Sequence, residues 1–136
     1  MTRSMVCALV FGCLFSAVVW AGTPDTELYL PSVGRGPGAN NSHWFTTVWM
    51  HNTSATTATV QIAFLERGQS NPSPITQQLL VAPGETLQLA DVFQDLYGLN
   101  RGYGALRFVS TERLAVSARI FNQTGADRAE SQGQFM

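Results

Sequence analysis

Apolar and polar residues alternate with a period of two along most of the chain after residue 22, which is typical of β-strands. Gly- and Pro-rich stretches at 34–41 and 68–74 interrupt the alternation and indicate loops. A chain patterned in this way folds as an all-β, antiparallel domain. The strands are expected over residues 27–31, 44–52, 58–66, 75–81, 86–90, 104–110 and 114–122.

Residues 91–98 break the alternation and predict one or two helical turns. Asp91 is a suitable N-cap, because its carboxylate can accept from a free backbone N–H of the first turn. Gly98 is a suitable stop, since glycine readily adopts the left-handed conformation that ends helices. We expect this short helix to close one end of the core, with Gly102 and Gly104 packed closely beside it.

Two antiparallel hairpins are expected from the parity of the apolar positions. A turn at 111–113 would place Phe108 opposite Val116 on one buried face. An earlier hairpin would place Val48 opposite Phe64 in the same manner. Strands joined in this way predict an immunoglobulin-like (Ig-like) antiparallel β-sandwich of about seven strands. A jelly roll or a small barrel is the alternative.

The N-terminus predicts a secretory signal peptide over residues 1–21. Arg3 precedes an apolar stretch over residues 5–20, and Ala21 fits the small-residue cleavage pattern. The stretch is shorter than the roughly 20 residues that a membrane-spanning helix needs. We therefore expect cleavage after Ala21 and a secreted or periplasmic domain over residues 22–136, with an uncleaved anchor as one alternative.

Both cysteines of the chain, Cys7 and Cys13, lie inside this apolar stretch. A lipoprotein modified at Cys13 is therefore the other alternative to cleavage. Once cleaved, the domain over 22–136 would have no disulfide, no Cys nucleophile and no thiolate metal site. A chain of this size still buries enough surface for one self-sufficient core.

The charge of the chain argues against two classes of partner. Its eight cationic side chains are all Arg, nine residues are acidic, and the formal net charge is −1 at pH 7. Nucleic-acid binding needs several clustered cations, and the sequence has no basic run. Electrostatic binding to a membrane surface needs the same feature. We therefore expect no nucleic-acid partner and no membrane insertion after signal cleavage.

No set of residues predicts an enzyme. His43 and His51 are the only candidate bases, and no Gly-x-Ser-x-Gly motif is present. Asp91 and Asp95 are spaced to share a cation on the short helix, but helix capping and solvation explain them more simply. The sequence predicts neither catalytic residues, nor a cofactor, nor a metal site.

Trp49 and His51 form the first part of a candidate binding surface, because both lie on the outer face of their expected strand. An exposed aromatic ring on a flat sheet stacks on sugar rings or anchors a protein partner. In the alternative interpretation, the loop 68–74 or the N-terminal segment covers Trp49.

Arg107 and Arg119 form the second part of the candidate surface, on the outer face of the last expected hairpin. Two neighbouring guanidinium groups can clamp a carboxylate. In the alternative interpretation they support solubility or pair with Glu66 or Glu112.

Motifs that span nearly all of residues 42–135 carry a family resemblance. They are SHWFTTVWMHNTS at 42–54, APGET at 82–86, DVFQDLYG at 91–98, GALRF at 104–108, SARIFN at 117–122 and GQF at 133–135. The chain resembles a domain that is common in secreted and surface proteins of bacteria, often as tandem Ig-like repeats. Such domains usually carry Asp in place of Thr47 and Tyr in place of Phe121. The resemblance implies an exported, non-enzymatic module.

The sequence therefore predicts an exported, non-enzymatic β-sandwich module with a structural, adhesive or protein-binding role in the bacterial envelope or outside the cell. A carbohydrate-binding module that uses the aromatic face at Trp49 is the alternative. The expected partners are an envelope protein, a glycan or another copy of the chain, since open edge strands can accept a further strand.

Overall fold

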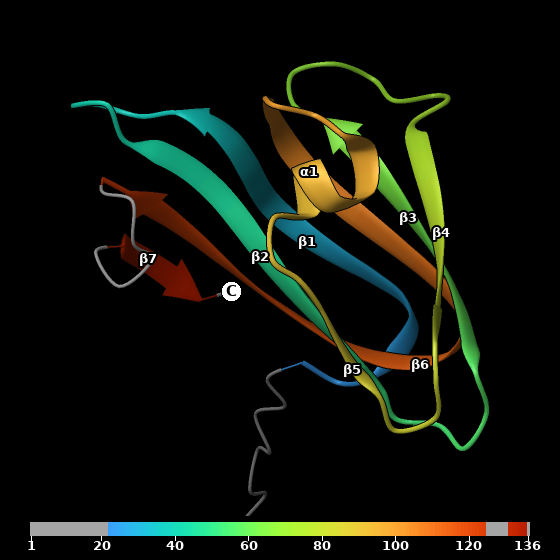
Figure 1. The fold of residues 1–136 in the computed structure, drawn as a ribbon. Coiled ribbons are helices and arrows are strands. Elements are labelled where there is room, and N and C mark those ends of the chain that lie inside the picture. Colours follow the sequence, from blue (N-terminus) through green and yellow to red (C-terminus); the bar gives the residue numbers. More distant parts are fainter. Residues whose placement is uncertain (1–21, 125–130, 136) are drawn as a thin grey trace, which may run out of the picture.

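The computed structural model describes residues 22–124 and 131–135, in which antiparallel strands make up most of the chain (Figure 1). The predicted all-β antiparallel class and the single short helix are confirmed for these residues. The elements, in chain order, are β1 (Asp25–Pro37), β2 (His43–Asn52), β3 (Ala58–Glu66), β4 (Ile75–Val81), β5 (Thr86–Leu89), α1 (Val92–Tyr97), β6 (Gly102–Gln123) and β7 (Ser131–Phe135).

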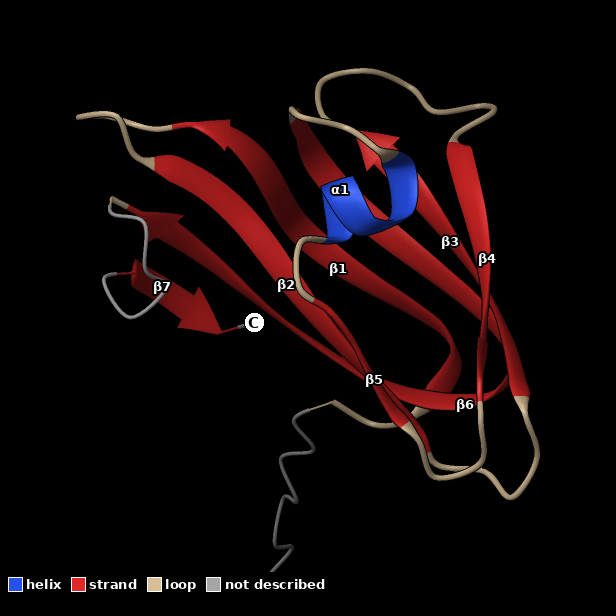
Figure 2. Cartoon of the chain, viewed as in Figure 1, coloured by secondary structure: helices blue, strands red, loops and turns tan. Residues whose placement is uncertain are grey.

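All the strands belong to one hydrogen-bonded sheet, which curls into a half-barrel (Figure 2). The strand order is β4-β3-β6-β1-β2-β5, β7 is added to β6, and β6 also pairs with β2. The predicted sandwich of two separate sheets is therefore not seen. Within the described residues, β4 and β5 are the two open edges of the curled path.

The expected hairpin with a turn at 111–113 is wrong, because β6 is one continuous strand of 22 residues. Phe108 lies opposite Ile62 of β3, and Val116 lies opposite Met50 of β2. The segment 111–113 contains no Gly, Pro or Asn that would stop a strand, so the alternation runs on through it.

The expected hairpin between β2 and β3 is also wrong. Val48 of β2 lies opposite Leu89 of β5 and Ala118 of β6. Phe64 of β3 lies opposite Ile75 of β4 and Leu106 of β6. The parity of the apolar residues correctly identifies which side chains face inward, but it does not say which strand lies alongside.

The core fills the inside of the curl, and α1 closes one end of it (Figure 1). The predicted caps of α1 are confirmed: the Asp91 carboxylate accepts from the backbone N–H of Gln94, and Gly98 adopts a left-handed conformation with φ 64°. A Cβ atom on Gly102 would overlap the ring of Phe93, so the predicted close packing beside the helix is confirmed for Gly102. For Gly104 it is wrong, because a Cβ atom there would overlap the backbone of Leu65 in β3 instead. The largest fully buried apolar side chains are Phe93, Phe108, Met50, Ile62, Leu106, Leu114, Val48, Val60, Val81 and Val92.

The fully buried Thr46 joins β1 to β2 at the point where the two strands separate. Its hydroxyl donates to the Gly34 carbonyl and accepts from the Gly34 N–H, both at 2.9 Å. This side chain therefore replaces the ladder hydrogen bonds that β2 no longer makes with β1. A buried backbone group that loses such a partner costs free energy.

Replacing Thr46 with Val should lower the free energy of unfolding by about 2 kcal/mol, because the buried N–H and C=O of Gly34 lose their partner while the side-chain shape is kept. Urea unfolding at neutral pH measures this loss. Thr46→Ser is the control, since it keeps the hydroxyl and should lose only about 1 kcal/mol with the methyl group. A Thr46→Val protein as stable as the wild type would contradict this role.

Candidate functional site

Trp49 and His51 lie together on the outer face of β2, as predicted, and both are half-buried. They line an open pocket of about 410 Å³. His51 Nδ1 lies 2.9 Å from the hydroxyl of Thr86, which fixes the orientation of the imidazole. Gly22, the first residue that the structure describes, also borders this pocket. The pocket is lined by Gly22, Trp49, His51, Thr86, Ala115, Val116 and Ser117.

Arg107 makes an ion pair with Glu27 of β1, not with Glu66 or Glu112 as expected; its Nε lies 2.8 Å from the carboxylate. The hydroxyl of Tyr29 donates to the same carboxylate at 2.9 Å. The hydrogen bonds from Tyr29 and Arg107 hold the pKa of Glu27 below its usual value. Because the group is exposed to solvent, the pair adds little to stability.

Arg119 lies on the other half of β6, and its guanidinium carbon is 5.2 Å from the centre of the Phe121 ring. Its neighbours across the strands are Thr47 and Phe135, whereas Arg107 lies opposite Tyr29. The two arginines would be diagonal neighbours on one face only in the hairpin that β6 does not form. They do not make up one carboxylate clamp.

The edge strand β4 is unusual in carrying no charge. Residues 68–84 contain no Asp, Glu, Lys or Arg, and the strand itself contains no Pro. Its seven residues pair with β3 in continuous register, without a bulge. Ile75 and Leu80 are 54% and 64% exposed, on opposite faces of the strand. Natural edge strands usually carry charge, Pro or a bulge that discourages a further strand.

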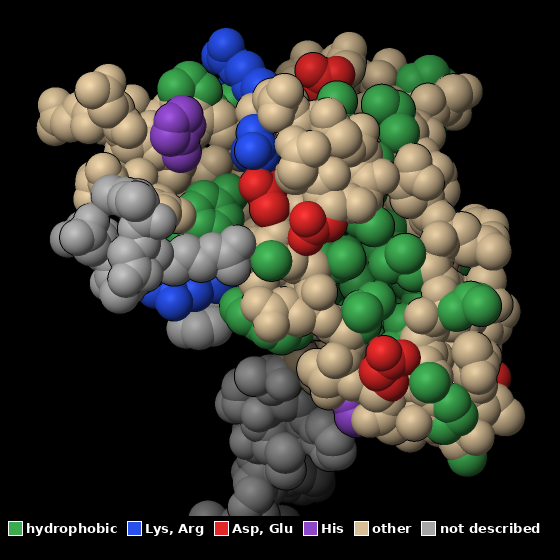
Figure 3. Space-filling model, in the orientation of Figure 1, with side chains coloured by type: hydrophobic (Ala, Val, Ile, Leu, Met, Phe, Trp, Pro, Cys, Tyr) green, Lys and Arg blue, Asp and Glu red, His purple; other side chains and the backbone are tan. Residues whose placement is uncertain are grey.

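Hydrophobic side chains also gather on the open side of the curl, below α1 and between β5 and β4 (Figure 3). Leu79 of β4, Leu87 of β5 and Leu96 of α1 are partly buried residues that pack on the core from these elements. The open side of the sheet is therefore apolar next to the uncharged edge.

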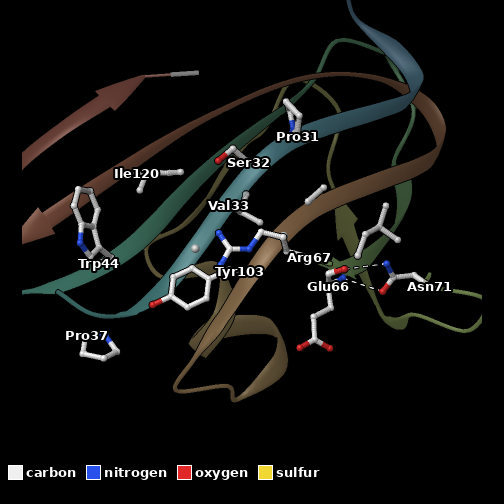
Figure 4. A pocket seen from close by; sticks show the side chains of 14 residues that line it. Pro31, Ser32, Val33, Pro37, Trp44, Glu66, Arg67, Asn71, Tyr103 and Ile120 are labelled. Carbon is white, nitrogen blue, oxygen red and sulfur yellow. Dashed lines mark hydrogen bonds between the residues drawn. The ribbon is translucent and has the colours of Figure 1, made fainter. Parts of the chain in front are cut away.

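A groove of about 560 Å³ lies where β1, β2, β3 and β6 meet (Figure 4). Trp44 lies at one end, Tyr103 and Arg67 lie in the middle, and Asn71 lies at the other end. Sequence reasoning missed this groove, because it depends on long-range strand pairing. The one local signal is the pair of glycine-flanked segments at 34–36 and 102–104.

The two aspartates of α1 are occupied in structural contacts. Asp91 caps the helix and also accepts from Arg35 Nε at 2.8 Å, and Asp95 accepts from the Asp91 N–H at 2.9 Å. In the part of the chain that the structure describes, no three His, Cys, Asp or Glu residues come together in a metal-binding group. No helix among residues 22–124 and 131–135 is long and apolar enough to cross a membrane.

No protein-family model and no curated protein sequence matches this chain. Thermotoga maritima 1070, a solved structure, is similar with a TM-score of 0.58 and 15% identity, over 82% of this chain and 90% of that one. The Anabaena sensory rhodopsin transducer is similar with a TM-score of 0.51 and 17% identity, over 73% of this chain and 99% of that one. At these identities the likeness concerns the fold alone, and the chain shares an all-β antiparallel fold with these proteins.

Proposed function

We propose that residues 22–136 act as an exported, non-enzymatic module that binds protein partners by adding a strand to β4. The observation that carries this proposal is the exposed, uncharged and unbulged edge of β4. Export is supported by the signal-like sequence of residues 1–21. The resemblance to surface modules of bacteria supports a role in binding rather than in catalysis.

Strand addition at β4 would satisfy two needs at once. The backbone groups on the open side of β4 gain hydrogen-bond partners, which provide most of the affinity in this type of recognition. The exposed side chains of Ile75 and Leu80 are covered on the two faces of the enlarged sheet. Proline at positions 74 and 83 marks the two ends of the available edge, so the partner strand would span about seven residues.

A second copy of this chain is a partner with suitable chemistry. If two β4 strands pair antiparallel about Gln78, then Thr76 lies opposite Leu80 and Ile75 lies opposite Val81. This arrangement brings no like charges together, and it closes by two-fold symmetry, the most frequent symmetry of soluble oligomers.

Replacing Gln78 with Lys should weaken self-association at least about tenfold, because two ammonium groups would lie side by side at the centre of the paired edges. Sedimentation velocity over a range of protein concentrations measures the association constant. Gln61→Lys is the matched control, since Gln61 lies directly opposite Gln78 on the same face but on the interior strand β3. Both side chains are exposed, so both variants should fold.

Wild-type protein that stays monomeric at every concentration would remove the second copy as the partner. Capture of envelope proteins from the native host then tests the wider proposal, by comparison of the wild type with Gln78→Lys and Gln61→Lys. If neither self-association nor capture depends on Gln78, the proposed function is wrong.

A carbohydrate-binding role is the second candidate function, favoured by the shared open pocket of Trp49 and His51. The indole could stack on one sugar ring, and the imidazole and the hydroxyls of Thr86 and Ser117 could bond to its hydroxyl groups.

Replacing Trp49 with Ala should abolish retention of the protein on a polysaccharide that retards the wild type in affinity electrophoresis, because the stacking surface is lost. Val109→Ala is the control, since it shortens an exposed apolar side chain on the outer face of β6, away from the pocket. Equal retention of Trp49→Ala and wild type, at equal unfolding midpoints, would rule out this role for the pocket.

A further inference from the structure

We propose that the groove between Trp44 and Arg67 binds a ring-shaped ligand that carries one carboxylate, independently of strand addition at β4. The groove volume of about 560 Å³ is within the range of small-molecule sites. The ligand chemistry follows from three features: a fixed cation, an exposed indole and a polar rim.

Tyr103 holds the cation of the groove in place. The guanidinium carbon of Arg67 lies 5.4 Å from the centre of the Tyr103 ring, and that of Arg101 lies 6.0 Å from it. The backbone N–H of Arg67 also donates to the backbone carbonyl of Tyr103 at 2.9 Å, which fixes the backbone from which the side chain extends. Figure 4 shows the Arg67 side chain extending over the Tyr103 ring on the groove side.

Two glycines of β1 let the Tyr103 ring lie close against the strand. A Cβ atom on Gly36 would overlap the Tyr103 hydroxyl, and a Cβ atom on Gly34 would lie 3.0 Å from the ring. Glycine is therefore needed at position 36 because of close approach, not because of a special backbone conformation. The ring in turn supports the position of Arg67.

Arg67 has no carboxylate partner within the described residues, although other arginines do. Arg35 is paired with Asp91, and Arg107 is paired with Glu27. A guanidinium that stacks on an aromatic ring keeps its edge N–H groups free to form two parallel hydrogen bonds with a carboxylate. Arg67 is exposed, so we expect the chain to fold without its charge.

The rest of the groove suits a ring that has an apolar face for stacking and hydroxyl or ether groups at its edge. Trp44 is 38% exposed at one end and offers an indole surface for stacking. Ile120 lies near it and adds apolar contact, whereas the exposed Ser32 lies on the rim with its hydroxyl drawn toward the groove (Figure 4). Asn71 is already bonded to the backbone of Glu66 and helps to shape the far end.

The local charge favours a singly charged ligand. Glu66 also lines the groove, but its carboxylate is directed away from Tyr103 and accepts from Gln69 (Figure 4). This negative charge near Arg67 would oppose a doubly charged phosphate more than a carboxylate. A uronic acid unit of a polysaccharide and a free cyclic carboxylic acid both have the required chemistry.

Isothermal titration of the purified protein with three probes tests the inference. Galacturonic acid and benzoate, each with one carboxylate, represent the two sources, and galactose is the uncharged comparison. We expect at least one acidic probe to bind more tightly than galactose, with an affinity that falls as salt is raised, because an exposed ion pair is screened. Preference for one acid identifies the source.

Arg67→Gln should weaken binding of the preferred acid about tenfold or more and remove its salt dependence, because a charge-assisted pair of hydrogen bonds is lost. Arg67→Lys should bind the preferred acid with an affinity between those of the wild type and Arg67→Gln, since lysine keeps the charge but not the planar pair of donors. Arg113→Gln, an exposed arginine outside the groove, is the control and should bind as the wild type does.

Nuclear magnetic resonance spectra provide a readout of position: the indole N–H of Trp44 should shift on addition of the acid. Unfolding midpoints of all variants verify that each one is folded. The inference is overturned if neither acid binds more tightly than galactose, or if Arg67→Gln and Arg113→Gln bind the acid equally well.

Discussion

The rest of the structure depends on the continuity of β6 from Gly102 to Gln123. Its first half is the central strand between β3 and β1, and its second half pairs with β2 and β7. Because this one strand pairs with β3 through its first half and with β2 through its second half, the sheet must curl around the core. Buried Leu106, Phe108, Leu114 and Ala118 from the two halves contribute to one hydrophobic cluster.

This arrangement also determines which surfaces stay open. Because β6 occupies the centre, β3 can offer only one side to β4, and β4 has no further strand beside it in the described residues. The same curl of the sheet brings Tyr103 and Ile120, from opposite halves of β6, to one groove that residues of β1 also line. The strand-accepting edge and the groove of Arg67 are thus two consequences of one topology.

Local features of the fold were predictable from the sequence, because neighbouring residues determine them. The helix at 91–98 is signalled by its own cap and stop residues, and the inward positions follow from parity. The pairing of Phe108 was not predictable, because a hairpin and a continuous strand place the same side chains inward. The ion pair of Arg107 with Glu27 was not predictable either, because it depends on the long-range pairing of β1 with β6.

The candidate sites also divide into those that local patterns predict and those that depend on long-range strand pairing. Trp49 and His51 share a pocket because they are two residues apart on one strand, which parity predicts. Trp44 and Arg67 share a groove only because β1 and β6 bring β2 and the end of β3 together, and no local pattern encodes this proximity. The uncharged run that contains β4 is visible in the sequence, but its position at an edge is not.

Disulfide trapping tests the continuity of β6 most directly, in a background in which Cys7 and Cys13 are replaced by Ala. Gln61 and Val109 lie opposite each other on the outer face of β3 and β6, so Gln61→Cys with Val109→Cys should form an intramolecular disulfide under mild oxidation. Arg107→Cys with Ser117→Cys should stay reduced, because these positions meet only across a hairpin at 111–113. A disulfide in the second variant and none in the first would contradict the fold.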